Sequence, residues 1–327
     1  MNAAPLLQVD GLDVEFGTAQ GTVQAVAGVG LEVRAGECLA VVGESGSGKT
    51  QLLLACLGLL AANGRSRGSV RFDAQELLGV PEDTLNRVRG TGIAMLSQDP
   101  MGALTPHLRI ETQLVEGLLD RGLASREEAR TRALQALRDV EIADPAARLR
   151  QYPHELSGGM RQRVALAIAR MCQPRLLFAD EPTTALDVSV QARVLELLAR
   201  ARDRGLGILI ITHDLGVVAG LADRVAVMYA GRIVETATTE RLFAAPAHPY
   251  TAALLAAVPR LHGQPAGRLP AIAGYPPRPG EVGVGCAFAP RCPRAIDECR
   301  QARPALQVDA ATGSAVACHR ALPVATA

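Results

Sequence analysis

The chain has 327 residues, 48% of them hydrophobic, and a formal net charge of +1. This length allows a large buried core and predicts two domains, one large and one small. A charge so close to zero gives no general attraction to nucleic acid or to an anionic membrane, and we expect no nucleic-acid partner. Residues 1–10 lack the pattern of a secretory signal, and no run of about 18 apolar residues predicts a membrane span.

A glycine-rich loop after a short apolar run carries the clearest chemical signal. The loop matches the phosphate-binding pattern G-x-x-x-x-G-K-[ST] at every fixed position, with Gly43, Glu44, Ser45, Gly46, Ser47, Gly48, Lys49 and Thr50. The flanking residues 38–42 and 51–60 predict a buried strand and a helix. Glycines let backbone N–H groups approach a triphosphate, Lys49 supplies positive charge to the β- and γ-phosphates, and Thr50 is the expected Mg²⁺ ligand. The alternative is a glycine-rich turn that happens to precede a lysine.

Alternating strands are predicted over residues 6–16 and 23–33, with a turn between them, and another short strand and turn over 67–77. Phe16 lies near the end of the first strand. Its ring can stack on adenine, or it can be a half-buried strand residue, and the spacing fits both interpretations.

Gln98 ends the next predicted strand, residues 92–98. Ligands collect at the carboxyl edge of open α/β sheets, so Gln98 is a candidate contact for Mg²⁺ or water; an exposed loop glutamine is the alternative. From residue 110 to about 150 the apolar spacing becomes helical, and Ser125 followed by Glu128 predicts a capped helix start. We interpret this insert as a helical subdomain.

A second candidate anion site is a helix start at Ser157, Gly158 and Gly159. Ser157 is the expected N-cap, and the two glycines leave the first backbone amides uncovered. Taken alone, the pattern also fits an ordinary helix start that contains glycine.

Two consecutive carboxylates, Asp180 and Glu181, follow the apolar residues 176–179. Asp180 at the strand end suits Mg²⁺. Glu181 is expected to point the other way by strand alternation, where it can act as a general base on water. A solvated acidic pair is the alternative.

Asp187 precedes a predicted helix over residues 190–202, and His213 follows a buried strand over 207–212. A histidine there can contact a γ-phosphate, although a single histidine at a strand end is often structural. Its interpretation depends on the other motifs.

Taken together and in this order, these motifs resemble the ATP-binding subunits of ABC transporters over about residues 6–260. The resemblance implies an α/β P-loop NTPase fold with a mixed sheet core, an antiparallel β subdomain and a helical subdomain at about residues 101–172. It implies an ATP-binding domain over residues 1–260 and a small, irregular, Cys-rich C-terminal module over 261–327. The implied elements are the Walker A loop at residues 43–50, the Q-loop at Gln98 and the signature at residues 156–160. They also include the Walker B pair Asp180 and Glu181, the D-loop at residues 185–187 and the switch histidine His213. Phe16 matches the adenine-stacking aromatic, and Thr50, Gln98 and Asp180 are the implied Mg²⁺ ligands.

Residues 98–101, 152–163 and 248–251 resemble the oligopeptide, dipeptide and nickel importers of this family. Residues 102–106 match less closely. The implied activity is ATP hydrolysis that drives peptide import, with a nickel or other small-solute importer, or a soluble ABC ATPase without a transport role, as alternatives. The implied partners are a second ABC ATPase or a second copy of this chain, two membrane permeases and an extracytoplasmic solute-binding protein. The implied location is peripheral, on the cytoplasmic face of the inner membrane.

Seven cysteines fall into two groups. Cys38, Cys56 and Cys172 lie in apolar surroundings and are expected to be buried thiols in a reducing compartment. The second group lies in the last 42 residues, with Cys286, Cys292, Cys299 and Cys318. Their spacing fits neither zinc ribbons nor common ferredoxins, and four thiols together favour a soft metal or a cluster. The family resemblance favours a [4Fe–4S] cluster, with zinc or no metal as alternatives and His319 as a substitute ligand.

Overall fold

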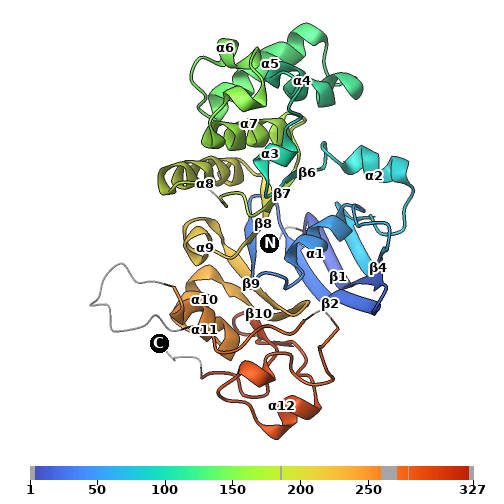
Figure 1. The fold of residues 1–327 in the computed structure, drawn as a ribbon, viewed down its shortest axis with the longest axis vertical. Coiled ribbons are helices and arrows are strands. Elements are labelled where there is room, and N and C mark those ends of the chain that lie inside the picture. Colours follow the sequence, from blue (N-terminus) through green and yellow to red (C-terminus); the bar gives the residue numbers. More distant parts are fainter. Residues whose placement is uncertain (1–3, 185, 259–270, 279, 324–327) are drawn as a thin grey trace. The chain divides into compact units, whose positions relative to one another are not determined.

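The computed structural model describes residues 4–184, 186–258, 271–278 and 280–323 (Figure 1). The chain forms two compact units. The first unit consists of residues 1–6, 33–38 and 79–211, and the second of residues 7–32, 39–78 and 212–327. The domain boundary predicted at residues 260–261 lies outside the described residues.

The second unit contains an antiparallel sheet with the strand order β2-β1-β4-β5. Its strands are β1 (Leu7–Thr18), β2 (Gly21–Val33), β4 (Gly64–Phe72) and β5 (Gln75–Glu76). In β1 the apolar side chains of Leu7, Val9, Leu12 and Val14 are buried. Each pair alternates as the sequence predicts, and the two pairs are separated by a register shift between Asp10 and Asp13.

The second unit also contains strands of a mixed sheet. Strand β3 (Cys38–Val42) pairs in parallel with β9 (Arg224–Tyr229), and β10 (Arg232–Thr238) pairs antiparallel with β9. Two short strands near the C-terminus, β11 (Gln307–Val308) and β12 (Ala315–Val316), continue the sheet beyond β10. The predicted irregular module thus contributes regular structure, because its residues near 315 pair with β10. The described helices of this unit are α1 (Lys49–Cys56), α9 (Leu215–Leu221), α10 (Thr239–Ala244), α11 (Pro249–Ala256), η2 (Ala289–Arg291) and α12 (Asp297–Gln301).

The first unit is built on parallel strands in the order β8-β7-β6. These are β6 (Ile93–Leu96), β7 (Leu176–Asp180) and β8 (Gly207–Thr212), and all residues of β7 and β8 are buried. Such burial explains their nearly continuous apolar sequences. Its described helices are α2 (Glu82–Val88), α3 (Pro100–Ala103), α4 (Ile110–Asp120), α5 (Arg126–Asp139), α6 (Pro145–Leu149), η1 (Pro153–Glu155), α7 (Gly158–Arg170) and α8 (Val188–Asp203).

The helical insert of the first unit begins its helices where the sequence predicts. The Ser125 hydroxyl accepts the Glu128 N–H at 3.3 Å, which caps α5. Helix α5 buries Ala129, Ala133 and Leu137, and it packs against α4 and α7 (Figure 1). The apolar spacing of three and four residues therefore marks the buried face of this helix.

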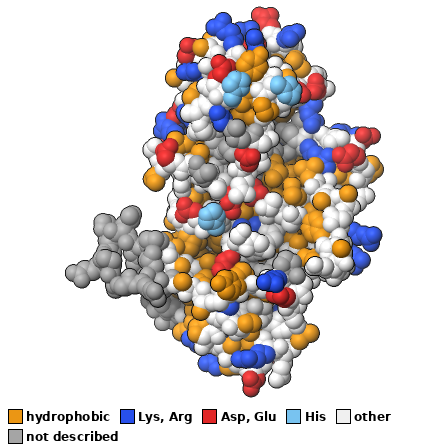
Figure 2. Space-filling model, viewed as in Figure 1, with side chains coloured by type: hydrophobic (Ala, Val, Ile, Leu, Met, Phe, Trp, Pro, Cys, Tyr) orange, Lys and Arg blue, Asp and Glu red, His pale blue; other side chains and the backbone are white. Residues whose placement is uncertain are grey.

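Charges of both signs are interspersed over the face drawn in Figure 2. This mixture agrees with a formal net charge of +1 over the whole chain. Within the described ranges, no helix has both the length and the apolar character that a membrane crossing requires.

Candidate nucleotide-binding site

The phosphate loop joins β3 to α1 in the second unit. Close packing requires glycine at its first and last glycine positions, the outer glycines Gly43 and Gly48. A Cβ on Gly43 would lie 2.1 Å from the Met228 carbonyl oxygen, and one on Gly48 would lie 2.2 Å from that of Ala25. Gly48 also has φ +100, a left-handed conformation that side chains disfavour. Gly46 has φ +78 but no neighbour within 4 Å of its Cβ position. The outer glycines therefore fit the loop against β2 and β9, while the middle one faces open space.

Lys49 lies inside this loop. Its side chain is buried, and Nζ donates to the carbonyl oxygens of Gly43 at 2.8 Å and Glu44 at 2.9 Å, and to the Ser47 hydroxyl at 3.3 Å. The backbone thus curls around a positive charge, the arrangement needed to hold a phosphate group. Thr50 follows in the first turn of α1 and is half-buried.

Glu44 in the same loop is held from two directions, which the sequence motifs did not indicate. Its backbone N–H donates to the Tyr250 hydroxyl at 2.9 Å. Its carboxylate accepts two hydrogen bonds from the Arg291 guanidinium, at 2.6 and 2.9 Å. Tyr250 belongs to the motif at residues 248–251 and Arg291 to the Cys-rich module, so the family resemblance had marked both segments without giving them a role.

An aromatic cluster supports these contacts. The Tyr250 ring centroid lies 4.6 Å from that of Tyr229 and 5.3 Å from that of Phe288. All three rings are at most 2% exposed. Arg291 also donates to the Tyr229 hydroxyl at 3.2 Å. The contacts to Glu44 therefore arise from a packed apolar cluster and not from mobile surface side chains.

The second unit also holds Phe16 and His213. Phe16 is half-buried in β1 and pairs with Gly64, where an added Cβ would lie 2.8 Å from the ring. His213 is exposed immediately after β8. Asp214 beside it caps α9 by accepting the Gly216 N–H at 2.7 Å. The ring of Phe16 is thus partly used in packing, and His213 is open to solvent.

The acidic pair lies in the first unit at the end of β7. Asp180 is the last strand residue and is buried. Glu181 has φ +46, a left-handed backbone conformation, so strand alternation does not set its direction and that premise was wrong. One carboxylate oxygen, Oε2, instead accepts from Gln98 Nε2 at 3.0 Å and from the Thr184 hydroxyl at 2.8 Å. The structure therefore brings Gln98 and Glu181 together.

The helix start at Ser157 has the predicted cap. The Ser157 hydroxyl accepts the Met160 N–H at 3.3 Å. A Cβ on Gly159 would lie 2.6 Å from Val190 Cγ1, so the first turn of α7 packs closely on the first turn of α8. Asp187 caps α8 by accepting the Val190 N–H at 2.9 Å. Ser157, Gly158, Gly159 and Asp187 consequently lie near one another, while Ala185 is outside the described residues.

A hydrogen bond to the Asp187 side chain has an electrostatic consequence. The Ser189 hydroxyl donates to its carboxylate at 2.6 Å, and this bond together with that of the Val190 N–H lowers the Asp187 pKa. Asp187 is therefore an anion well below neutral pH.

Gln162 is a further residue whose role the sequence did not reveal. Its side chain is 1% exposed, and Nε2 donates to the Pro182 carbonyl at 2.6 Å. This bond ties the helix that begins at Ser157 to the residue that follows Glu181. The polar position inside an apolar helix face was the available signal.

Four cysteines of the C-terminal part line one cavity: Cys286, Cys292, Cys299 and Cys318. The Cys286 N–H donates to the Cys299 carbonyl at 2.8 Å, and burial raises the pKa of the Cys286 and Cys318 thiols. Across the described ranges, no three His, Cys, Asp or Glu side chains are arranged to hold a metal ion. His319 lines the same cavity, and its Nδ1 lies 3.4 Å from the Glu298 carboxylate. Of the other cysteines, Cys38 and Cys56 are buried and Cys172 is half-buried.

Comparisons with known proteins identify the family. Residues 26–184 match the family model described as ABC transporter, and residues 234–299 match the oligopeptide/dipeptide transporter C-terminal region. The oligopeptide transport ATP-binding protein OppD of Salmonella typhimurium is 48% identical over 300 residues, which cover 91% of this chain and 89% of the relative. The chain belongs to the ABC transporter ATP-binding proteins of the oligopeptide type. This membership confirms the predicted family.

Other relatives agree with this assignment. The OppD protein of Mycobacterium tuberculosis is 49% identical over 319 residues. That match covers 97% of this chain but 52% of the relative, so the ABC protein described here spans about half the length of the mycobacterial one. Among solved structures, the dimeric bacterial ABC transporter cassette MJ0796 aligns with a TM-score of 0.64 and 27% identity, covering 71% of this chain and 98% of the cassette. The predicted fold class is thereby confirmed.

Proposed function

We propose that this chain is the ATP-hydrolysing subunit of an ABC importer for di- or oligopeptides. The observation that carries the proposal is the pair of family matches in one chain, a nucleotide-binding match over residues 26–184 and an oligopeptide-type match over 234–299. The relatives named oligopeptide transport ATP-binding proteins support the cargo class.

The residues divide the work between binding and hydrolysis. The phosphate loop binds the triphosphate through its backbone N–H groups, and the Lys49 ammonium offsets phosphate charge. Phe16 stacks on adenine. Glu181, oriented by Gln98 and Thr184, accepts a proton from the attacking water. His213 contacts the γ-phosphate.

Magnesium is the expected metal of this reaction. Thr50, Gln98 and Asp180 offer a hydroxyl, an amide and a carboxylate, all oxygen donors of the kind that Mg²⁺ prefers. When bound, the ion neutralises charge on the β- and γ-phosphates.

The helix start at Ser157, Gly158 and Gly159 supplies a second anion site, which completes the nucleotide site of another ATPase subunit. Asp187 lies beside it and belongs to the same subunit contact. We therefore propose a dimer of ATPases, made with a related chain or a second copy, in which each ATP lies between two subunits. Two permeases and an extracytoplasmic solute-binding protein complete the importer, with this chain peripheral on the cytoplasmic face of the inner membrane.

Co-purification from native membranes in mild detergent tests the assembly. Two polytopic permeases, a second ATPase and a solute-binding protein are expected, and the cargo of the last component identifies the substrate. A nickel-binding protein in the complex would replace the peptide assignment with the nickel alternative. Recovery only from the soluble fraction would contradict the importer and favour an ABC ATPase without a transport role.

For the four C-terminal cysteines we propose a [4Fe–4S] cluster held by Cys286, Cys292, Cys299 and Cys318. The support is that these four thiols line one cavity, although their described arrangement is not one that holds a metal ion. When bound, a cluster would cross-link the module through its sulfur ligands. Anaerobic purification with iron and zinc analysis is the test: a broad visible absorbance band with iron is expected, while stoichiometric zinc or no metal would refute the cluster.

A further inference from the structure

Arg291 connects the Cys-rich module to the phosphate loop. Its guanidinium forms a two-pronged ion pair with the Glu44 carboxylate, with N–O distances of 2.6 and 2.9 Å. The Arg291 side chain is 5% exposed and that of Glu44 is 26% exposed. Planar, two-pronged pairs of this kind fix geometry as well as charge.

The placement of Arg291 is set by the module itself. The residue ends the short η2 turn, whose first residue, Ala289, accepts the Cys292 N–H at 3.3 Å. Arg291 Nε donates to the Ala273 carbonyl at 3.0 Å, and its guanidinium lies 5.9 Å from the Tyr229 ring centroid. Arg291 is therefore fixed by the η2 turn beside Cys292, by the Ala273 carbonyl and by the aromatic cluster.

Glu44 needs such a partner because of what the loop binds. A carboxylate in a loop that receives a triphosphate repels the ligand, and the repulsion grows with the number of phosphate charges. The Arg291 guanidinium offsets the negative charge of the Glu44 carboxylate by pairing with it directly. The two hydrogen bonds from the Arg291 guanidinium also hold the loop at Glu44, while the Lys49 ammonium lies inside the loop.

We propose that Arg291 is a positioning residue for the nucleotide loop: it neutralises Glu44, holds the loop in its ATP-binding form and makes ATP affinity depend on the Cys-rich module. The proposal rests on the proposed function in that ATP is the ligand. It assigns the Cys-rich module a role in nucleotide binding, which the match to the oligopeptide/dipeptide transporter C-terminal region does not specify.

Equilibrium titration of the full chain with fluorescent ATP and ADP analogues tests the proposal. Arg291→Gln leaves the Glu44 charge without its partner, so the dissociation constant for ATP should rise about tenfold and that for ADP should rise less. Arg291→Lys keeps the charge but loses the fork, and its ATP affinity should lie between that of Arg291→Gln and that of the parent protein.

The double variant separates charge from folding. Glu44→Gln combined with Arg291→Gln removes both charges, and we expect most of the lost ATP affinity to return. If Arg291 only stabilised the module, the double variant would bind ATP as weakly as Arg291→Gln, and equal losses for ATP and ADP would lead to the same conclusion.

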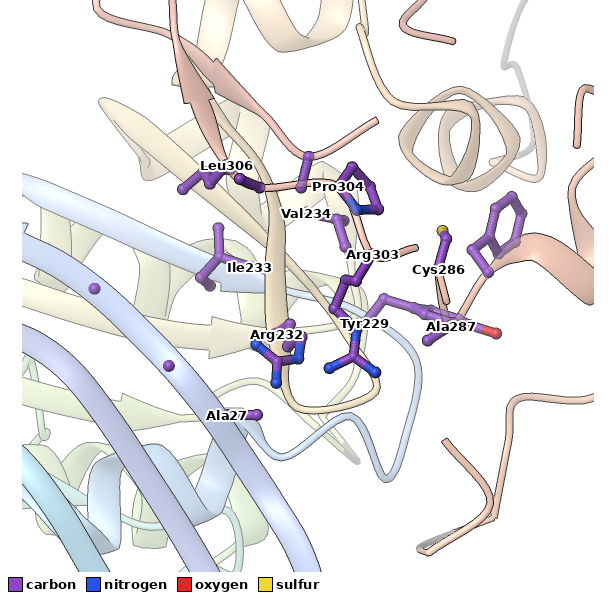
Figure 3. A pocket seen from close by; sticks show the side chains of 15 residues that line it. Ala27, Tyr229, Arg232, Ile233, Val234, Cys286, Ala287, Arg303, Pro304 and Leu306 are labelled. Atoms are coloured by element: carbon purple, nitrogen blue, oxygen red, sulfur yellow. The ribbon is translucent and has the colours of Figure 1, made fainter. Parts of the chain in front are cut away.

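Arg232 provides a matched control. Figure 3 shows Arg232 from β10 and Arg303 from the Cys-rich module pointing into one pocket, which Cys286 and Tyr229 also line. Arg232→Gln makes the same change in net charge near the same module, and no contact joins Arg232 to Glu44 among the residues that the structure describes. Its ATP affinity should be unchanged; a loss equal to that of Arg291→Gln would overturn the specific pairing. If the parent protein itself fails to bind ATP, the proposed function fails and not only this inference.

Discussion

The side-chain amide of Gln98 donates to the Glu181 carboxylate across 3.0 Å, although the two residues are 83 positions apart in the chain. Glu181 has a left-handed backbone conformation. Its carboxylate is oriented by this hydrogen bond and by the one from the Thr184 hydroxyl. A carboxylate held from two sides has a fixed direction, which suits the general-base role that we propose for Glu181. The relationship therefore links Gln98, two residues beyond the end of β6, to the residue that we propose as the proton acceptor.

Glu181→Gln should retain ATP binding and lower ATP hydrolysis by roughly 100-fold or more, because an amide cannot accept the proton of the attacking water. Phosphate release under saturating ATP measures turnover, and a fluorescent ATP analogue measures binding. Thr184→Val is the matched comparison, since it removes one hydrogen bond and keeps the carboxylate. Near-normal hydrolysis by Glu181→Gln would remove this residue from the base role.

The local motifs were readable from the sequence for physical reasons. Buried parallel strands such as β7 and β8 leave nearly continuous apolar runs, and the caps at Ser125 and Ser157 act within three residues. Contacts of this range depend on side chains that lie next to one another in the sequence. The two capped helix starts and the buried strands therefore agree with the structure, whereas the predicted strand over residues 92–98 ends earlier, at Leu96 in β6.

Long-range contacts left no comparable signal. Glu44 and Arg291 are 247 positions apart, and β12 joins β10 across about 80 residues of chain. Nothing in the periodicity of either segment specifies such a partner. The left-handed conformation of Glu181 was missed for a related reason, since it depends on the surrounding backbone and not on the residue type.

Gln162→Leu should destabilise the protein by about 1–3 kcal/mol, because the buried Pro182 carbonyl loses its only described side-chain donor. The substitution is close in volume and keeps the helix propensity of the position. Thermal melting of the full chain measures the loss. An exposed amide, Gln135→Leu on α5, serves as the control and should melt within a degree or two of the parent protein; equal shifts for both variants would refute a special role for the buried bond.

Tyr250→Phe should weaken ATP binding about fivefold, the effect of losing one hydrogen bond of about 1 kcal/mol. The phenyl ring keeps its contacts with Tyr229 and Phe288, so only the acceptor for the Glu44 N–H is removed. Titration with an ATP analogue measures the change. Unaltered affinity together with an unaltered melting temperature would show that this hydroxyl does not shape the phosphate loop.

Gly48→Ala should damage the loop more than Gly46→Ala, since the two positions differ in the space around them. A Cβ at Gly48 meets the Ala25 carbonyl at 2.2 Å, whereas Gly46 has no neighbour within 4 Å of its Cβ position. Both have positive φ, so each substitution costs about 1 kcal/mol or more in backbone strain alone. We expect lost ATP binding and a lower melting temperature for Gly48→Ala; a larger loss for Gly46→Ala would contradict the packing argument.

His248 should make stability depend on pH. Its side chain is 1% exposed, and burial lowers its pKa from 6.5 to about 4. The folded state therefore keeps the imidazole neutral between these values while the unfolded state binds a proton, so stability is full above about pH 6.5 and falls as the pH drops towards 4. The full shift corresponds to about 3 kcal/mol.

The comparison variant for this prediction is His248→Asn. In the parent protein, His248 Nδ1 accepts the Tyr250 N–H at 3.0 Å and caps α11, and an asparagine side-chain oxygen can cap a helix in the same way. Urea unfolding at intervals from pH 7 to pH 4 should show a steeper loss of stability for the parent protein than for His248→Asn. Parallel curves for the two proteins would mean that other groups cause the acid sensitivity, because the asparagine cannot titrate in this range.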